Sequence, residues 1–388
     1  MAVQAGAADD TRSAAQETKQ DAGQMSQWRL MLRRFKQSKL SVFGLIVLVL
    51  MYAIAAISSF LAPYDYDRID SNSSYKAPTK ITWANGGPAV CGEVQTLDEK
   101  LLEWQYKNDC TKTYPIEFFT QSYPYKLFGF IPTSVHLFGV PEAPADSNAT
   151  PVEGQARPSK LYLVGGDKEG RDVFSRILQG SRVSLTVGLV GVVFATVLGS
   201  ILGTASGYFG GAVDNIMQRV IELIGSIPTI PLWAALAAAL PGNISVVRRY
   251  FLITLILSLI AWTGLARQVR GKVLSYRTAD YTSAARAAGS SHLRVILTHM
   301  IPNAFSHIIV VAALAVPATI LAETTLSFLG FGMQAPAVSW GTLLQDAQSI
   351  AVVTRYPWLL LPGLAVVIAL LCYQFLGDGL RDAADPYG

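Results

Sequence analysis

Apolar residues gather in six long runs along this chain, and polar segments separate the runs. A bilayer core about 30 Å thick needs roughly 20 apolar residues per helix, because backbone N–H and C=O groups find no water there. The third run is the weakest, since Glu222, Pro228 and Pro231 interrupt it. The pattern predicts an all-α membrane protein in which six helices cross the bilayer. The runs extend approximately over residues 40–62, 183–208, 216–240, 250–266, 308–330 and 356–376.

Composition agrees with a polytopic membrane protein. Of the 388 residues, 51% are hydrophobic and only 15% are charged, and the mean hydropathy is +0.35. These values lie outside the usual range of soluble globular domains. The formal net charge of +4 is small, so the positions of the basic residues are more informative than their sum.

Basic residues form two clusters, one before the first run and one between the fourth and the fifth. Cytoplasmic loops are enriched in Lys and Arg, and an even number of spans separates the clusters. Both clusters and both termini are therefore expected in the cytoplasm. Arg248 and Arg249 fall in a loop assigned to the outside and argue weakly against this orientation. The clusters are Arg29, Arg33, Arg34, Lys36 and Lys39, and Arg267, Arg270, Lys272, Arg277, Arg286 and Arg294.

The pattern divides the chain into four parts. Residues 1–39 form a polar cytoplasmic tail and basic flank, of which residues 1–24 are expected to be disordered. Residues 40–62 form the first span, which is too long for a signal-peptide core and is expected to remain as an anchor. Residues 63–165 form an insertion outside the membrane. Residues 166–388 form the core with spans two to six and a cytoplasmic loop at 267–303.

Two of the three cysteines, Cys91 and Cys110, lie in the insertion, and Cys372 lies in the last span. In an oxidising compartment, two cysteines in one small segment favour a disulfide, which would close a loop of about 20 residues and contribute about 3 kcal/mol. Two free or buried thiols are the alternative that the sequence leaves open.

The cytoplasmic loop is basic and rich in alanine, and it predicts a helix, a break at Gly289 and a second helix. Small side chains at 284–288 make a surface that another helix can approach closely. Gly289 permits a sharp change of direction because it lacks a Cβ. Leu293, Ile296 and Leu297 form an apolar stripe at helical spacing. Such a short helix pair either docks on a partner or packs on its own bundle.

The residues SAARAAGSSHLRVILTHMIPN at 283–303 resemble the EAA loop of ABC-importer permeases. In that pattern Glu-Ala-Ala is followed by three residues, Gly, nine residues and Ile-x-Leu-Pro. Ala284, Ala285, Gly289 and Pro302 match the spacing, whereas Ser283 replaces the acid and His299 replaces the Ile. Segments 165–188, 322–344 and 356–386 resemble the C-type permease of dipeptide, oligopeptide and nickel importers. The family does not account for the long insertion.

The resemblance implies a six-helix type I permease in a bacterial inner membrane, with a periplasmic insertion between the first two helices. It implies a paralogous permease, two ABC ATPase subunits and a periplasmic substrate-binding protein as partners, besides membrane lipid and without nucleic acid. Peptides are the first substrate expected, with opines, nickel chelates and glycosides as further possibilities. The loop is expected to supply the coupling helix that fits a groove of the ATPase. Its coupling residues would be Ser283, Ala284, Ala285, Arg286, Ala288, Gly289, Leu293 and Pro302.

The chain carries no GxxxxGK[ST] phosphate loop, so ATP and Mg²⁺ are expected in partner subunits and no cofactor or metal in this chain. The histidines have no convincing metal-ligand spacing, and no catalytic residue is expected. A membrane-embedded enzyme would need convergent acids, a Ser/Lys pair or metal ligands at membrane depth. A secondary transporter would normally carry internal repeats and paired intramembrane charges. These two classes are the alternatives to a permease subunit.

Charged residues inside spans have a functional reading by default, because they are costly there. Glu323 is a candidate for the substrate pathway, and a bond to a neighbouring helix is the favoured alternative. Glu222 follows Arg219 by three residues, so an intrahelical pair explains it. At the predicted periplasmic mouth, Asp167, Gly170, Arg171 and Asp172 either receive a binding protein or simply cap and anchor the second span through Asp172, Arg171 and Arg176.

Overall fold

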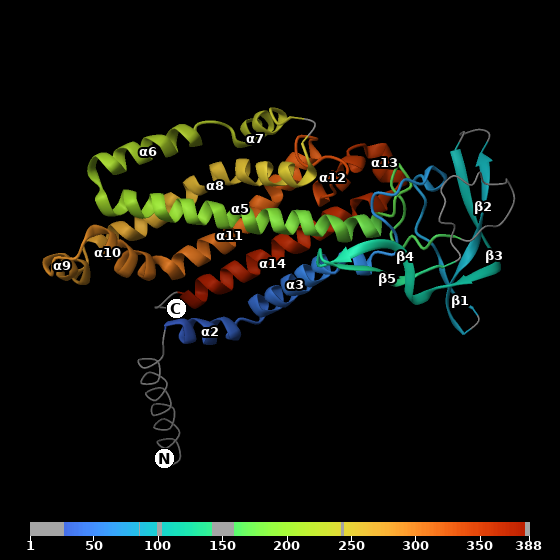
Figure 1. The fold of residues 1–388 in the computed structure, drawn as a ribbon, viewed down its shortest axis with the longest axis horizontal. Coiled ribbons are helices and arrows are strands. Elements are labelled where there is room, and N and C mark those ends of the chain that lie inside the picture. Colours follow the sequence, from blue (N-terminus) through green and yellow to red (C-terminus); the bar gives the residue numbers. More distant parts are fainter. Residues whose placement is uncertain (1–26, 85, 99–102, 142–158, 242–243, 385–388) are drawn as a thin grey trace, which may run out of the picture.

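The computed structural model describes residues 27–84, 86–98, 103–141, 159–241 and 244–384. The disorder expected for residues 1–24 lies outside these ranges. Figure 1 shows long helices running side by side along the longest axis of the molecule, with the β-strands at one end and α9 and α10 at the other. These ends are called the sheet end and the α9 end below.

Among the described residues, five helical segments are long and apolar enough to cross a membrane. A sixth candidate is the pair α6 (Gly211–Gly225) and α7 (Thr229–Ala238), which is bent by 80° at its break. The break coincides with Pro228, which has no N–H to continue a helix. The predicted count of six is confirmed if the bent pair is one span. The five are α3 (Lys39–Ala56), α5 (Val173–Phe209), α8 (Val246–Arg277), His292–Phe328 and Pro357–Ala384.

Several of these helices extend well beyond the apolar runs, α5 and α8 among them. α5 begins at Val173 rather than near residue 183, and α8 continues to Arg277 rather than ending near 266. The basic residues from Arg267 to Arg277 therefore lie on a helix and not in a loop, which corrects that part of the sequence analysis. One reason is a partner on α6, since the Arg270 guanidinium donates to the two Asp214 carboxylate oxygens at 2.5 and 2.6 Å.

Small residues set the distance between α5 and α8. Gly199, Gly203 and Gly207 of α5 recur every four residues, so they share one face of the helix, and that face lies against α8. A Cβ at Gly203 would lie only 2.9 Å from the Cα of Ala266. Such close approach gains dispersion contacts where lipid removes the hydrophobic driving force between helices.

A buried apolar cluster lies where α5 meets three other helices of the bundle. Leu185, Ile320, Trp340 and Ala369 are nearly inaccessible there. They belong to α5, α11 (Ile301–Phe328), the short helix α12 (Trp340–Leu344) and α14 (Leu361–Ala384). The smaller helical elements are α2 (Gln27–Gln37), α4 (Ser58–Leu61), η1 (Ser71–Ser73), α9 (Asp280–Ala287), α10 (His292–Val295), η2 (Ile296–Met300), η3 (Gln345–Ala347), α13 (Ile350–Arg355) and η4 (Pro357–Leu360).

The insertion folds into strands, which the sequence analysis did not predict. β1 (Ile81–Ala84), β2 (Gly87–Asp98) and β3 (Glu103–Pro115) form an antiparallel sheet in that order. β4 (Glu117–Leu127) and β5 (Ile131–Gly139) form a hairpin. In the structure a disulfide joins Cys91 of β2 to Cys110 of β3, with their Cα atoms 4.5 Å apart. The bundle is helical as expected, and the sheets lie at one end of it (Figure 1).

Candidate coupling surface and outer mouth

The predicted helix–break–helix at the α9 end is present in the structure. α8 ends at Arg277, α9 follows, and the chain then reverses at Gly289, whose φ of 83° lies in the left-handed region. No atom lies within 4 Å of a Cβ built at Gly289, so its backbone conformation, not crowding, favours glycine. Ser291 caps α10 by accepting a hydrogen bond from the N–H of Arg294.

One face of α9 is anchored to the bundle. The buried Thr282 hydroxyl donates to the carbonyl oxygen of Tyr276 at 2.8 Å. Ala285 is half-buried against the apolar cluster that includes Val273 and Val295. Ala285 therefore faces inward, whereas the sequence analysis placed it among the coupling residues without distinguishing a face.

The side of α9 away from this cluster is exposed, and so are two leucines that follow α9 in the chain. Leu293 is 66% exposed and Leu297 is 57% exposed. These two leucines and the other exposed residues expected to couple are together called the coupling face below. The other expected coupling residues on it are Ser283, Ala284, Arg286, Ala288, Gly289 and Pro302, all exposed.

The second helix is not the separate unit that the sequence analysis predicted. α10 passes through the π-helical turn η2 into α11, so His292–Phe328 is one continuous helical segment. Pro302 at the start of α11 lacks an N–H, which disfavours a regular helical bond there and accommodates the wider turn. The Asn303 side-chain amide donates to the carbonyl of His299 at 2.7 Å. The backbone thus joins α9 to α8 on one side and, through α10 and η2, to α11 on the other.

The four expected mouth residues lie together at the sheet end, and their polar groups bond to one another and to neighbouring residues of this chain. The Asp167 carboxylate accepts from the Arg171 side chain at 2.8 Å and from the backbone N–H groups of Glu169 and Arg171 at 2.9 Å. Gly170 has a φ of 70°, and a Cβ there would meet the carbonyl group of Asp70. These contacts favour the capping and anchoring interpretation over an open receiving site.

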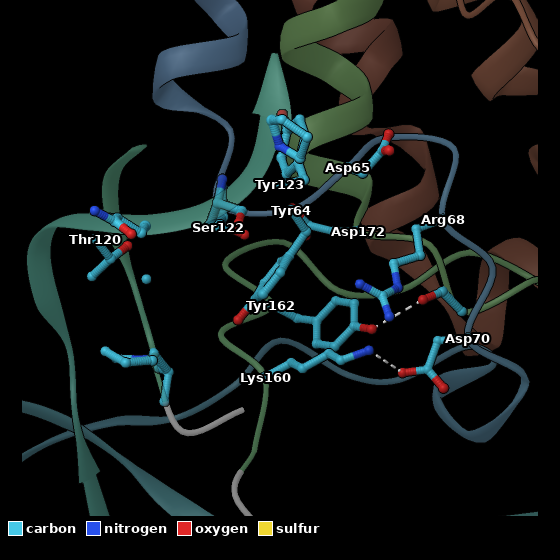
Figure 2. Close-up of a pocket in the computed structure, with 17 residues that line it drawn as sticks. Tyr64, Asp65, Arg68, Asp70, Thr120, Ser122, Tyr123, Lys160, Tyr162 and Asp172 are labelled. Carbon is cyan, nitrogen blue, oxygen red and sulfur yellow. Dashed lines mark hydrogen bonds and ion pairs between the residues drawn. The ribbon is translucent and has the colours of Figure 1, made fainter. Parts of the chain in front are cut away.

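Asp172 is the N-cap of α5, because its carboxylate accepts from the Ser175 backbone N–H at 2.9 Å. Burial raises the pKa of this carboxyl to about 6. Asp172 also lines a cavity of about 460 Å³, most of whose other lining residues belong to the insertion. Figure 2 shows Tyr64, Tyr162 and Lys160 beside this cavity, with the Lys160 ammonium paired to Asp70 at 2.5 Å.

Glu323 is fully buried in α11. Its carboxylate accepts hydrogen bonds from the hydroxyl of Ser184 on α5 at 3.1 Å and from that of Ser327 at 2.7 Å. The Ser184 hydroxyl in turn accepts from the Trp340 backbone N–H. These contacts point the carboxylate into this chain's own core, which favours the structural alternative over a pathway role. Glu222 is exposed and paired with Arg219 at 2.8 Å, as its spacing indicates.

Several contacts that position these sites had no signal in the sequence. At the α9 end, the Tyr208 hydroxyl and the His292 imidazole Nδ1 lie 2.9 Å apart and join α5 to α10. At the sheet end, the Trp358 indole donates to the Gly166 carbonyl at 3.0 Å. Within the described ranges no three His, Cys, Asp or Glu side chains are grouped as a metal site would require.

Comparison with known proteins identifies the family. The family described as "binding-protein-dependent transport system inner membrane component" matches residues 195–387, and the "N-terminal TM domain of oligopeptide transport permease C" matches residues 26–78. A dipeptide transport system permease protein DppC of Lactococcus lactis is 31% identical over 91% of this chain and 89% of its own length. The chain belongs to this permease family.

Two further relatives agree with this assignment. The oligopeptide transport system permease protein OppC of Haemophilus influenzae is 42% identical, over 58% of this chain and 70% of its own length. The OppC of Bacillus subtilis is 36% identical, over 59% of this chain and 73% of its own length. The resemblance to a C-type ABC-importer permease is thereby confirmed, and the chain is a multi-pass membrane permease component.

Proposed function

We propose that this chain is one transmembrane subunit of an ATP-driven importer for peptides or peptide-like solutes. A second, paralogous permease would complete the pathway, and a periplasmic binding protein would deliver the substrate. Two ATPase subunits would hydrolyse ATP. The names of the relatives, which describe dipeptide and oligopeptide transport, support this substrate class for the present chain.

The observation that carries the proposal is the coupling face. It exposes two leucines where two membrane-length helices, α8 and the segment His292–Phe328, come closest in sequence. The chain that carries it is continuous with both of these helices. An exposed apolar patch outside the membrane is typical of a protein–protein contact. Closure of an ATPase pair would push this face as a rigid body and tilt α8 and α11 with it.

Orientation follows from the same assignment. The coupling face must lie in the cytoplasm to meet the ATPases. Both described ends of the chain, near α2 and α14, then lie on the cytoplasmic side of a bacterial inner membrane. The sheets then lie in the periplasm, where a disulfide between Cys91 and Cys110 is stable.

Leu293→Asp tests the proposal, with Leu293→Met as the matched control because methionine keeps an apolar surface of similar volume. We expect the Asp variant to insert normally but to lose ATP-dependent uptake in proteoliposomes, since burying an unpaired carboxylate in the contact is costly. The Met variant should transport normally. Normal uptake by Leu293→Asp would remove the coupling role.

The alternative classes are separated by proteoliposomes that hold this chain without partners. The proposal predicts no uptake and no hydrolytic or transfer activity. Uptake driven by an ion gradient alone would favour a secondary transporter, and product formation would favour an enzyme.

A further inference from the structure

A second cavity, of about 660 Å³, opens at the α9 end between the bundle and the short helix α2. We call it the basic cavity. Elements far apart in sequence meet there: α2, the last turns of α8, α9, the start of α11 and the end of α14. Its basic residues are Arg34, Lys272, His307 and Arg381.

The charge of this lining is one-sided. Among the described residues that line the basic cavity, none is acidic. Asp280, Asp378 and Asp382 lie on the same helices but outside the lining, and Asp378 accepts from Gln374 at 3.1 Å. The Lys272 ammonium of α8 and the Arg381 guanidinium of α14 both line this cavity, and an anion between them would reduce their mutual repulsion.

The remaining lining is suited to a phosphate that carries an apolar tail. Tyr281 and Ser306 add hydroxyl groups, and Leu30, Met31, Val310 and Ala383 add an apolar wall. Arg and Lys donors bind phosphate oxygens through charge-assisted hydrogen bonds.

The helix that covers the cavity has the properties of an interfacial helix. Met31 and Phe35 of α2 are buried against Ala383 of α14, whereas Arg33 and Lys36 on its other side are exposed. A basic amphipathic helix of this kind lies in the headgroup layer of a membrane. The basic cavity therefore opens at the depth where phospholipid headgroups lie.

We propose that the basic cavity binds a phosphate anion, which the headgroup of an anionic phospholipid or free inorganic phosphate could supply. The apolar wall and the interfacial helix favour the phospholipid. A basic pocket between helices on the cytoplasmic side is suited to anionic headgroups. The bound phosphate joins α2 and α14 to α8 and α11 next to the coupling face. This site goes beyond the proposed transport function, and its test requires no transport.

The test uses the purified importer in nanodiscs of phosphatidylcholine that contain a minor fraction of phosphatidylglycerol. Native mass spectrometry then measures which phospholipid the permease retains. We expect retained phosphatidylglycerol in preference to phosphatidylcholine. Lys272→Gln and Arg381→Gln should each weaken this preference about fivefold. Lys36→Gln is the matched control, because it removes the same charge from an exposed position of α2 outside the cavity.

A parallel titration with inorganic phosphate separates the two sources. Phosphate binding that Lys272→Gln abolishes, without any preference for phosphatidylglycerol, would assign the site to free phosphate. Lys272→Arg keeps the charge and should retain the wild-type preference. The proposal is overturned if neither anion binds, or if Lys272→Gln and Lys36→Gln behave alike. It is also overturned if Lys272→Arg loses the anion as completely as Lys272→Gln.

Discussion

Gly289 offers the sharpest perturbation of the coupling segment, because its substitution changes backbone strain and nothing else nearby. Its φ of 83° is one that residues with a Cβ rarely adopt, and no atom lies within 4 Å of a Cβ built there. The left-handed conformation costs roughly 1–2 kcal/mol for an ordinary L-residue. If the ATPase binds α9 in the observed orientation, Gly289→Ala weakens that association about five- to thirtyfold.

A graded series makes this prediction quantitative. Asparagine tolerates the left-handed region better than alanine, so Gly289→Asn should fall between wild type and Gly289→Ala. Gly264→Ala is the control, since a Cβ at this α8 position also meets nothing within 4 Å and needs no unusual φ. The assay is the affinity of the detergent-purified permease pair for its ATPase subunits. Equal affinities for wild type and Gly289→Ala would refute the reasoning that this turn orients α9.

Three further predictions concern the bundle and the insertion. Gly203→Ala should lower the free energy of unfolding of the purified protein by about 1–3 kcal/mol, because the added methyl group overpacks against α8. Gly271→Ala is the control: no atom lies within 4 Å of a Cβ built there, so the change should be neutral or slightly stabilising. The pKa of the Asp172 carboxyl is raised to about 6 from 3.8, so the folded state binds more protons and stability falls as pH rises from about 4 to 6. Asp172→Asn, which keeps the N-cap, should flatten that fall in thermal melts recorded across this range. Replacing both Cys91 and Cys110 by Ser should cost the insertion about 3 kcal/mol, seen as faster proteolysis of residues 63–165 while the bundle stays protected.

The sequence was sufficient to predict the helices of the bundle, because a bilayer without water requires a long run of apolar residues in each crossing helix. It placed their ends poorly. Arg267 and Lys272 are charged, so the hydropathy pattern ends the span before them. α8 nevertheless continues, and Arg270 within this extension forms an ion pair with Asp214 of α6. That partner is 56 residues away, and no local pattern indicates it.

The composition of the insertion also indicates strands. Residues 117–139 are rich in aromatic and β-branched residues, a composition typical of β-strands. For the coupling segment, the spacing of Ala284, Ala285 and Gly289 was sufficient to predict the break. It could not show that Ala285 faces inward, because that depends on Val273 and Val295 of other elements.

Contact between the coupling face and an ATPase subunit tests the central claim most directly. A photo-crosslinking residue at Leu293 should capture an ATPase subunit in intact membranes, in a manner that changes when ATP is bound. One at Leu321, which is 50% exposed on α11 within the span, should capture only lipid or another membrane protein. Absence of an ATPase adduct at Leu293, or its labelling by reagents added outside the cell, would contradict the account.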